Sequence, residues 1–128
     1  MKKEIRILNQ RDNLLLPLVF VDDLPPKIDI QIYLSGYRTR AEIIIAFLGC
    51  NTGISEMNIV LAHEAPETYG RVILKAALFD QSRLTFRGML DIKESAKGAD
   101  SHLLAKALVL SPNAKAEIYP YLEIKTDE

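Results

Sequence analysis

Hydrophobic and polar residues alternate along most of the chain, in short segments separated by polar breaks. The alternation is strictest in Lys27-Ile28-Asp29-Ile30-Gln31-Ile32, where it predicts a strand with isoleucines on one face and polar side chains on the other. Residues 41–47 contain Ala and Ile, and residues 101–110 are rich in Ala and Leu, but neither segment sustains a helical period for three turns. The pattern therefore predicts no long helix and nine strands, at 5–8, 15–21, 28–34, 41–48, 57–62, 71–79, 84–92, 103–110 and 116–124.

The breaks between these segments contain turn-forming residues, which lie at Ser35-Gly36, Gly49 to Gly53, Ala65-Pro66, Gly98 and Ser111 to Asn113. A series of evenly spaced short strands predicts an all-β domain, either a sandwich, a barrel or a solenoid. The chain has no Asn-Gly or Asp-Gly dipeptide, the usual turn of a tight antiparallel hairpin. It also lacks a hexapeptide or nonapeptide repeat typical of regular β-helices. The pattern alone leaves the sandwich and the solenoid open.

Composition restricts the class of protein. The chain has 128 residues, 48% apolar and 26% charged, which predicts one folded domain over residues 1–128. Its net charge of −1 argues against a dedicated nucleic-acid binder. The longest apolar run, residues 14–21, is shorter than the roughly 20 residues of a membrane helix, and no cleavage site of a signal peptide follows it. The single cysteine excludes an intrachain disulfide, and we expect a reduced, cytoplasmic protein without a membrane partner.

The candidate catalytic and metal-binding residues are few and isolated. Cys50 has no Lys, Arg or His within several residues to lower the pKa of its thiol, so we interpret it as a small apolar residue at a turn. His63-Glu64 begins like a zinc-protease motif, but Glu67 stands where the second histidine is needed. His102 has no second ligand at metal spacing. We therefore expect neither a catalytic site nor a metal site.

The charged clusters are interpreted in the same way. Asp22-Asp23 and Asp127-Glu128 lie in a loop and at the chain end, where solvated charge is expected. Residues 37–40, Tyr-Arg-Thr-Arg, predict a charged turn and not a nucleic-acid contact on a chain of neutral charge. The sequence contains no glycine-rich phosphate loop and no nucleophile elbow, so we predict that the protein is not an enzyme.

The last third of the chain carries a family resemblance. Its order of motifs is Phe86-Arg87-Gly88, Ala96, Leu108-Val109-Leu110-Ser111, Ala114 and Pro120-Tyr121-Leu122-Glu123-Ile124. This resembles the core of the SufB/SufD family, the scaffold proteins of the SUF iron–sulfur cluster assembly system. The resemblance implies a right-handed parallel β-helix, and it thereby favours the solenoid. In such a fold Phe86 and Leu110 are expected to point inward, and Gly88 to mark a close approach of two segments.

The departures from the family limit what the resemblance implies. In SufB-type members a cysteine important for cluster assembly lies at the position that Ala105 occupies here, and the polar neighbours are Leu103 and Leu104. His102 matches no family ligand position. Asp127-Glu128 fits the acidic pair of the family, whereas the Cys-x-His-Gly segment and the helical region that docks on the SufC ATPase have no counterpart in these 128 residues. We therefore assign no cluster ligand and no contact with a SufC-like ATPase.

The expected function is that of a scaffold acting through protein association. The strand at 117–124 ends four residues from the chain end, and we predict that it forms the contact in a homodimer, or in a heterodimer with a longer SufB/SufD-like partner. The predicted interface residues are Ile118, Pro120, Leu122 and Ile124. Since Cys50 is the only thiolate, we expect no iron–sulfur cluster to be bound tightly by this chain alone. The alternatives are a structural, self-associating solenoid without cluster chemistry, and a small-molecule- or carbohydrate-binding domain or minor enzyme.

Overall fold

The computed structural model describes residues 1–126 and contains nine strands and no helix in that range. Every predicted strand is present, most of them longer by one to three residues than the alternation indicated. The predicted acidic pair Asp127-Glu128, and with it the end of the predicted domain 1–128, lies outside the described residues. The strands are β1 (Lys2–Ile7), β2 (Asn13–Phe20), β3 (Lys27–Leu34), β4 (Arg40–Gly49), β5 (Ile54–His63), β6 (Tyr69–Leu78), β7 (Arg83–Ile92), β8 (Asp100–Val109) and β9 (Lys115–Ile124).

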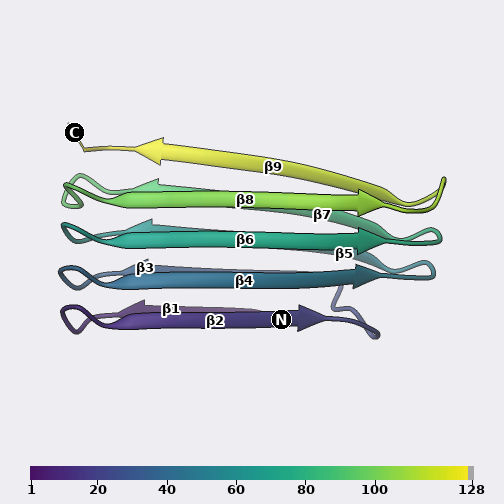
Figure 1. Cartoon of the computed structure of the whole chain (residues 1–128), viewed down its shortest axis with the longest axis horizontal. Helices are drawn as coiled ribbons and strands as arrows, with labels where there is room; N and C mark the ends of the chain where they lie inside the picture. Colours follow the sequence, from purple (N-terminus) through teal and green to yellow (C-terminus); the bar gives the residue numbers. More distant parts are fainter. Residues whose placement is uncertain (127–128) are drawn as a thin grey trace.

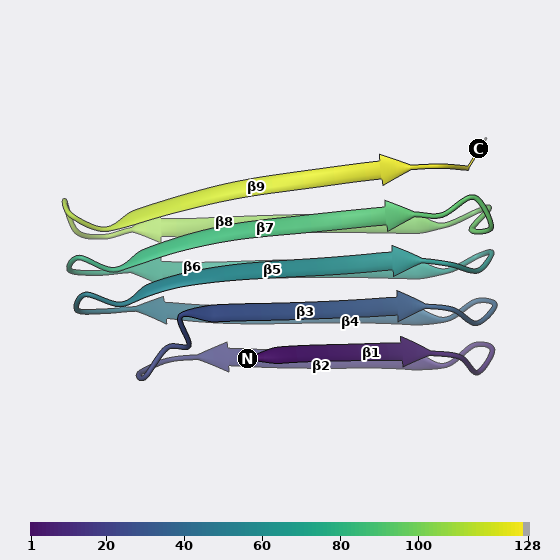
Figure 2. The ribbon, with the colours of Figure 1, turned by 180° about the vertical axis from the view of Figure 1, so that it is seen from behind.

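The strands form two parallel sheets, with β1-β3-β5-β7-β9 in one and β2-β4-β6-β8 in the other. Consecutive strands alternate between the sheets, so each coil of the chain contributes one strand to each (Figures 1 and 2). Each strand pairs with its counterpart one coil later; Ile30 lies opposite Ile59, for example, and Ile43 opposite Val72. This topology is a parallel β-solenoid and confirms the fold class. Among the described residues the strands pair only in this parallel, coil-to-coil way, so the alternative of a β-sandwich is wrong.

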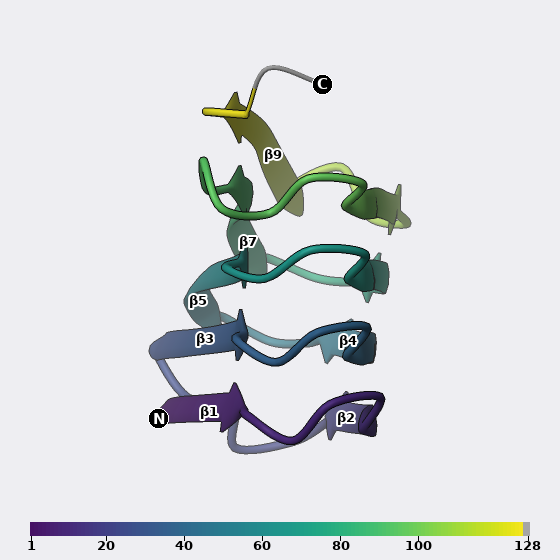
Figure 3. The same cartoon turned by 90° about the vertical axis from the view of Figure 1, so that its left-hand side faces the viewer.

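The core lies between the two sheets, which Figure 3 shows from one end. Residues of alternate parity point inward and stack from coil to coil, because parallel pairing in register places like positions above one another. Thus Ile28, Met57 and Phe86 form one buried row, and Ile45 and Leu74 lie in another on the opposite sheet. Burial of these branched and aromatic side chains supplies the main stabilisation of the fold.

The turns at one end of the solenoid repeat a left-handed backbone conformation. Arg11, Arg38, Glu67 and Gly98 have φ values of 64°, 58°, 58° and 74°, and they occupy equivalent positions in successive coils. Backbone hydrogen bonds join these turns to one another, from Arg11 N to the carbonyl of Tyr37 and onward in the same way at the next coils. Each turn is therefore held by its neighbour. Three of these left-handed residues carry side chains, at a conformational cost that the stacking offsets.

Two expectations about the last coils have different outcomes. The expectation that Leu110 points inward is wrong, because β8 ends at Val109 and Leu110 lies in the following turn with 53% of its surface exposed. Gly88 does mark a close approach, since a Cβ there would lie 2.9 Å from Cε2 of Phe86 and 3.0 Å from Cδ2 of Leu103 on the opposite sheet. Within residues 1–126 there is no helix long and apolar enough to cross a membrane.

Candidate functional site: the C-terminal edge of the solenoid

The last strand, β9, has a partner on one side only. It lies parallel to β7, with Phe86 opposite Ile118 and Leu90 opposite Leu122. No strand of the described chain pairs with its other edge, and β8 ends its own sheet in the same way. Both strands lie at the outer end of the stack (Figure 1). A free strand edge presents N–H and C=O groups that a further strand can pair with.

The inner face of β9 is apolar and open to solvent. Its inward positions continue the buried rows of β7, and they are the predicted interface residues Ile118, Pro120, Leu122 and Ile124. Ile118 still packs against the core, whereas Leu122 and Ile124 are 62% and 52% exposed. Figures 1 and 3 show that β9 diverges from β8, so the two sheets are not closed over each other here. The last coil therefore exposes side chains at positions that β5 and β7 bury.

Pro120 lies in this edge strand opposite Gly88. A proline has no backbone N–H to donate, which restricts it to edge strands and bulges. Its place at the free end of the five-stranded sheet agrees with that rule. A strand that pairs with β9 would lack a backbone donor at Pro120.

The outer face of β9 carries charged pairs. The Tyr119 hydroxyl donates a hydrogen bond to Glu117 over 2.5 Å, which raises the pKa of Tyr119 and lowers that of Glu117. Nζ of Lys125 lies 3.5 Å from Asp91 and 3.4 Å from Glu123. The outer face of β9 therefore carries both signs of charge beside the exposed apolar positions of its inner face. Such charges contribute to the specificity of binding more than to its affinity.

The cysteine and the aspartate pair lie elsewhere. Cys50 is half-buried in the turn after β4, where its carbonyl accepts a hydrogen bond from the N–H of Gly53. With Asp22 and Asp23 it lines a shallow hollow of about 290 Å³. These three side chains line the same hollow, but they are not arranged to hold a metal ion. Within residues 1–126 no group of three or more His, Cys, Asp and Glu side chains has metal-binding geometry.

His63 is fully buried at the end of β5. Its Nδ1 lies 2.8 Å from the hydroxyl of Thr68 and its Nε2 2.9 Å from that of Ser101. The Thr68 hydroxyl donates to the carbonyl of Ala65, so it accepts from Nδ1–H, and Nε2 accepts from Ser101. Burial lowers the pKa of His63 to about 4, against the opposing effects of Asp100 and Asp91. Sequence reasoning found the polar strand end but not this network, since no local pattern connects residues 63 and 101.

The remaining sequence candidates are also held within the fold. His102 is on the outside of β8, 2.8 Å from Asp100, and its ring contacts Tyr69. Ala105 is half-buried in β8, so the position of the family cysteine carries a methyl group near the open end. Arg40 lies over the ring of Tyr69 at 4.4 Å, in agreement with a charged turn. The structure does not bring these residues together into one reactive site.

The fold and its open end define the chain as a two-sheet parallel β-solenoid with an uncovered apolar C-terminal coil. Comparison with known proteins adds the family. Residues 27–128 match the SufBD core domain of the SUF system for FeS cluster assembly. The chain therefore belongs to the SufBD family.

The individual relatives are distant and much longer. An iron–sulfur cluster assembly SufBD family protein of Mycobacterium bovis is 24% identical over 98 residues, which is 76% of this chain and 12% of the relative. A chloroplastic SufBD family protein of Arabidopsis thaliana is 24% identical over 95 residues, 74% of this chain and 17% of the relative. One from Staphylococcus saprophyticus is 28% identical over 83 residues, 65% of this chain and 18% of the relative. No solved structure matches the chain.

Proposed function

We propose that this chain acts as a scaffold component of iron–sulfur cluster assembly and works by protein association, not by catalysis. Membership of the SufBD family supports the process. The observation that carries the mode of action is the exposure of Leu122 and Ile124 on a face that is buried in the preceding coil. We also propose a cytoplasmic location, because a lone reduced cysteine is typical of that compartment.

The proposed partner is a second copy of this chain or a longer SufB/SufD-like protein. Addition of a strand to β9 would supply the missing backbone hydrogen bonds and cover the inner face of β9 in one step. Residues 12–26 do not cover β9, because they contain β2 and lie at the opposite end of the stack (Figure 1).

Substitution of Leu122 by Lys should weaken this association at least tenfold, which corresponds to about 1.4 kcal/mol. A charge at the centre of the apolar strand would have to be desolvated on binding. Sedimentation of the wild type at micromolar concentration should give a dimer that the variant shifts toward monomer. Leu8→Lys is the matched control, since Leu8 is 65% exposed in the first turn, away from the edge. A monomeric wild type that also ignores a SufBD family partner would refute the proposal. A homodimer that rejects such a partner would favour the structural, self-associating alternative.

The donors of the described residues do not fit a cluster held by one chain. Iron–sulfur clusters are usually held by four Cys thiolates, and Cys50 is the single cysteine of the sequence. We expect anaerobic reconstitution of the isolated protein, followed by iron and sulfide analysis, to give far less than one cluster per chain. One cluster per chain that is lost in Cys50→Ala would contradict this expectation. Clusters shared between two chains would appear at half that ratio or less and would place Cys50 at a contact.

A further inference from the structure

The outer face of the four-stranded sheet is largely apolar over the C-terminal half of its strands, whereas the other half carries Arg40, Glu42, Arg71 and His102. Side chains that point away from the core include Leu15 and Val19 of β2, Ile44 and Leu48 of β4, and Leu104 and Leu108 of β8; we call these six residues the β2–β8 face. Four of them are more than half exposed, and Val19 reaches 73%. This face is a second surface, distinct from the C-terminal edge, and its six residues come from three of the four strands of its sheet.

The other sheet has an outer face of the opposite character. There Asp29, Asn58 and Arg87 occupy one row, Nδ2 of Asn58 donates to Asp29 over 3.0 Å, and Arg87 pairs with Glu56 at 2.6 Å. Polar outer positions of this kind produce the strict alternation of β3. The solvent-facing side of this sheet is therefore built from hydrogen-bonded polar rows, whereas the four-stranded sheet has such a pair, Arg71 with Glu42 at 3.4 Å, in the N-terminal half of its strands and apolar side chains in the other half.

The sequences of the two sheets differ in part, since apolar runs occur in every strand of the four-stranded sheet and, in the other sheet, in β5 as Ile59-Val60-Leu61-Ala62. Strands β2, β4, β6 and β8 contain continuous apolar runs such as Leu14-Leu15-Leu16 and Ile43-Ile44-Ile45. Continuous runs in parallel strands are typical of sheets that are covered on both faces, whereas alternation is typical of one covered and one solvated face. The chain covers only the inner side of this sheet, so the runs indicate that something else covers the outer side.

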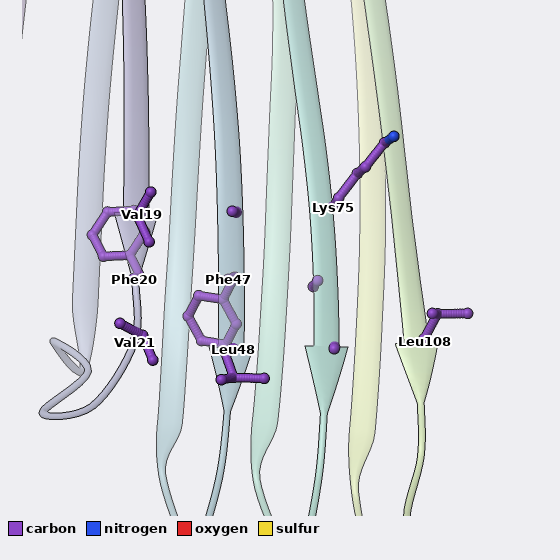
Figure 4. A pocket seen from close by; sticks show the side chains of 10 residues that line it. Val19, Phe20, Val21, Phe47, Leu48, Lys75 and Leu108 are labelled. Carbon is purple, nitrogen blue, oxygen red and sulfur yellow. The ribbon is translucent and has the colours of Figure 1, made fainter.

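The β2–β8 face is hollowed toward the ends of β2, β4 and β6. A hollow of about 450 Å³ is lined there by apolar side chains, among them Val19, Val21, Leu48 and Leu108, together with Lys75 (Figure 4). Lys75 lies directly opposite Lys106 in the register of β6 and β8, and both side chains are exposed. Among the described residues no carboxylate lies within ion-pair distance of either ammonium group, so two cations stand side by side on β6 and β8, between the apolar row of Ile73 and Leu104 and that of Ala77 and Leu108.

We propose that the β2–β8 face binds an amphipathic α-helix of a partner protein, with apolar side chains against the hollow and carboxylates over Lys75 and Lys106. The apolar half of a ten-residue strand is about 17 Å long, the length of a helix of about 11 residues. Four strands span about 14 Å between the outermost ones, enough for a helix of about 10 Å diameter. Packing of a helix on a sheet is also the usual way in which both elements bury their apolar faces.

The two lysines argue against a second copy as the occupant. If two copies paired through this face, the four ammonium groups would be brought into the same desolvated interface, while the carboxylate of Glu42 on this face already pairs with Arg71. A helix with carboxylates at its border neutralises them. This inference does not depend on the C-terminal edge, because the two surfaces lie on different strands and β9 contributes nothing to the β2–β8 face.

The test uses two labelled synthetic peptides of 18 residues and the whole chain. The acidic peptide has Leu and Ala on one helical face and Glu at its borders, and the basic peptide has Lys in place of each Glu. By fluorescence anisotropy we expect the acidic peptide to bind at least tenfold more tightly than the basic one. The double variant Lys75→Glu with Lys106→Glu should reverse this preference, and both positions are exposed, so the variant is expected to fold.

Two controls separate this surface from others. Lys2→Glu with Lys27→Glu makes the same change of charge on the other sheet and should leave the peptide preference unchanged. Leu122→Lys should also leave it unchanged, even where it abolishes dimerisation. Equal binding of the two peptides, or a preference that ignores the reversal at Lys75 and Lys106, would overturn the proposal. Binding to phosphatidylglycerol vesicles without binding of the acidic peptide would overturn it in favour of a membrane surface. A dimer that dissociates in the variant Ile44→Glu would also overturn the proposal, and would show that a second copy of the chain covers this face.

Discussion

Replacement of Ile59 by Ala should lower the free energy of unfolding by about 2–5 kcal/mol. Ile59 lies in β5, at the middle of the five-stranded sheet, and only 1% of its surface is exposed. It stacks on Ile30 of the previous coil and lies opposite Gly88 of the next. Because Gly88 has no side chain to move into the space, the cavity left by the shortened side chain should stay largely open.

The matched control is Ile54→Ala in the same strand. Ile54 is 67% exposed, so its shortening should change the free energy of unfolding by less than about 0.5 kcal/mol. Denaturation by urea, followed by circular dichroism, measures both variants against the wild type. Equal losses for Ile54 and Ile59 would show that the stacked row between the sheets does not form the stabilising core.

The strands could be predicted from the sequence because inward and outward positions alternate within each of them, as in residues 27–32. The direction of pairing could not, since a strand in a parallel solenoid and one in an antiparallel sandwich have the same period of two. The resemblance around Phe86 and Gly88 decided between them. The close contact at Gly88 then supplied a physical reason for that glycine.

The turns and the chain ends were less predictable. Arg11, Arg38 and Glu67 adopt left-handed backbone conformations that their residue types do not favour, because hydrogen bonds from the next coil determine the turn. Leu110 was assigned inward by its place in an apolar run. It is exposed because no further coil lies over that turn, and the run itself carries no information about which coil is the last.

The candidate site was predictable in part. The apolar positions of β9 were visible in the sequence, and the structure adds that Leu122 and Ile124 lack cover. The β2–β8 face was also present in the sequence, as continuous runs such as residues 14–16, but a run does not say which of its residues point outward. That assignment requires the register between strands. The buried contact between His63 and Ser101 joins two coils and has no local trace at all.

Acidification from pH 7 to pH 4 should destabilise the protein through His63. The pKa of this side chain is about 4 in the folded chain and 6.5 in an unfolded one, so between these values the unfolded state binds the proton more readily. The stabilisation is therefore fully present above pH 6.5 and is lost as the pH falls toward 4, to a total of about 3 kcal/mol. Its cause is burial, because the neutral imidazole already satisfies both of its nitrogens with Thr68 and Ser101.

Carboxylates titrate in the same range, so the contribution of His63 must be measured as a difference. The free energy of unfolding of the wild type and of His63→Gln should be determined at intervals from pH 7.5 to pH 4. The wild type should lose about 3 kcal/mol more than the variant over this range. His102→Gln removes the exposed imidazole and is the matched control for a histidine-to-glutamine substitution outside the core. A direct measurement follows the imidazole Cε1 proton of His63 by NMR, which should change its shift only near pH 4. Protonation of His63 above pH 6, or equal slopes for the wild type and His63→Gln, would contradict the assignment of a neutral buried histidine that the two hydroxyl groups hold in place.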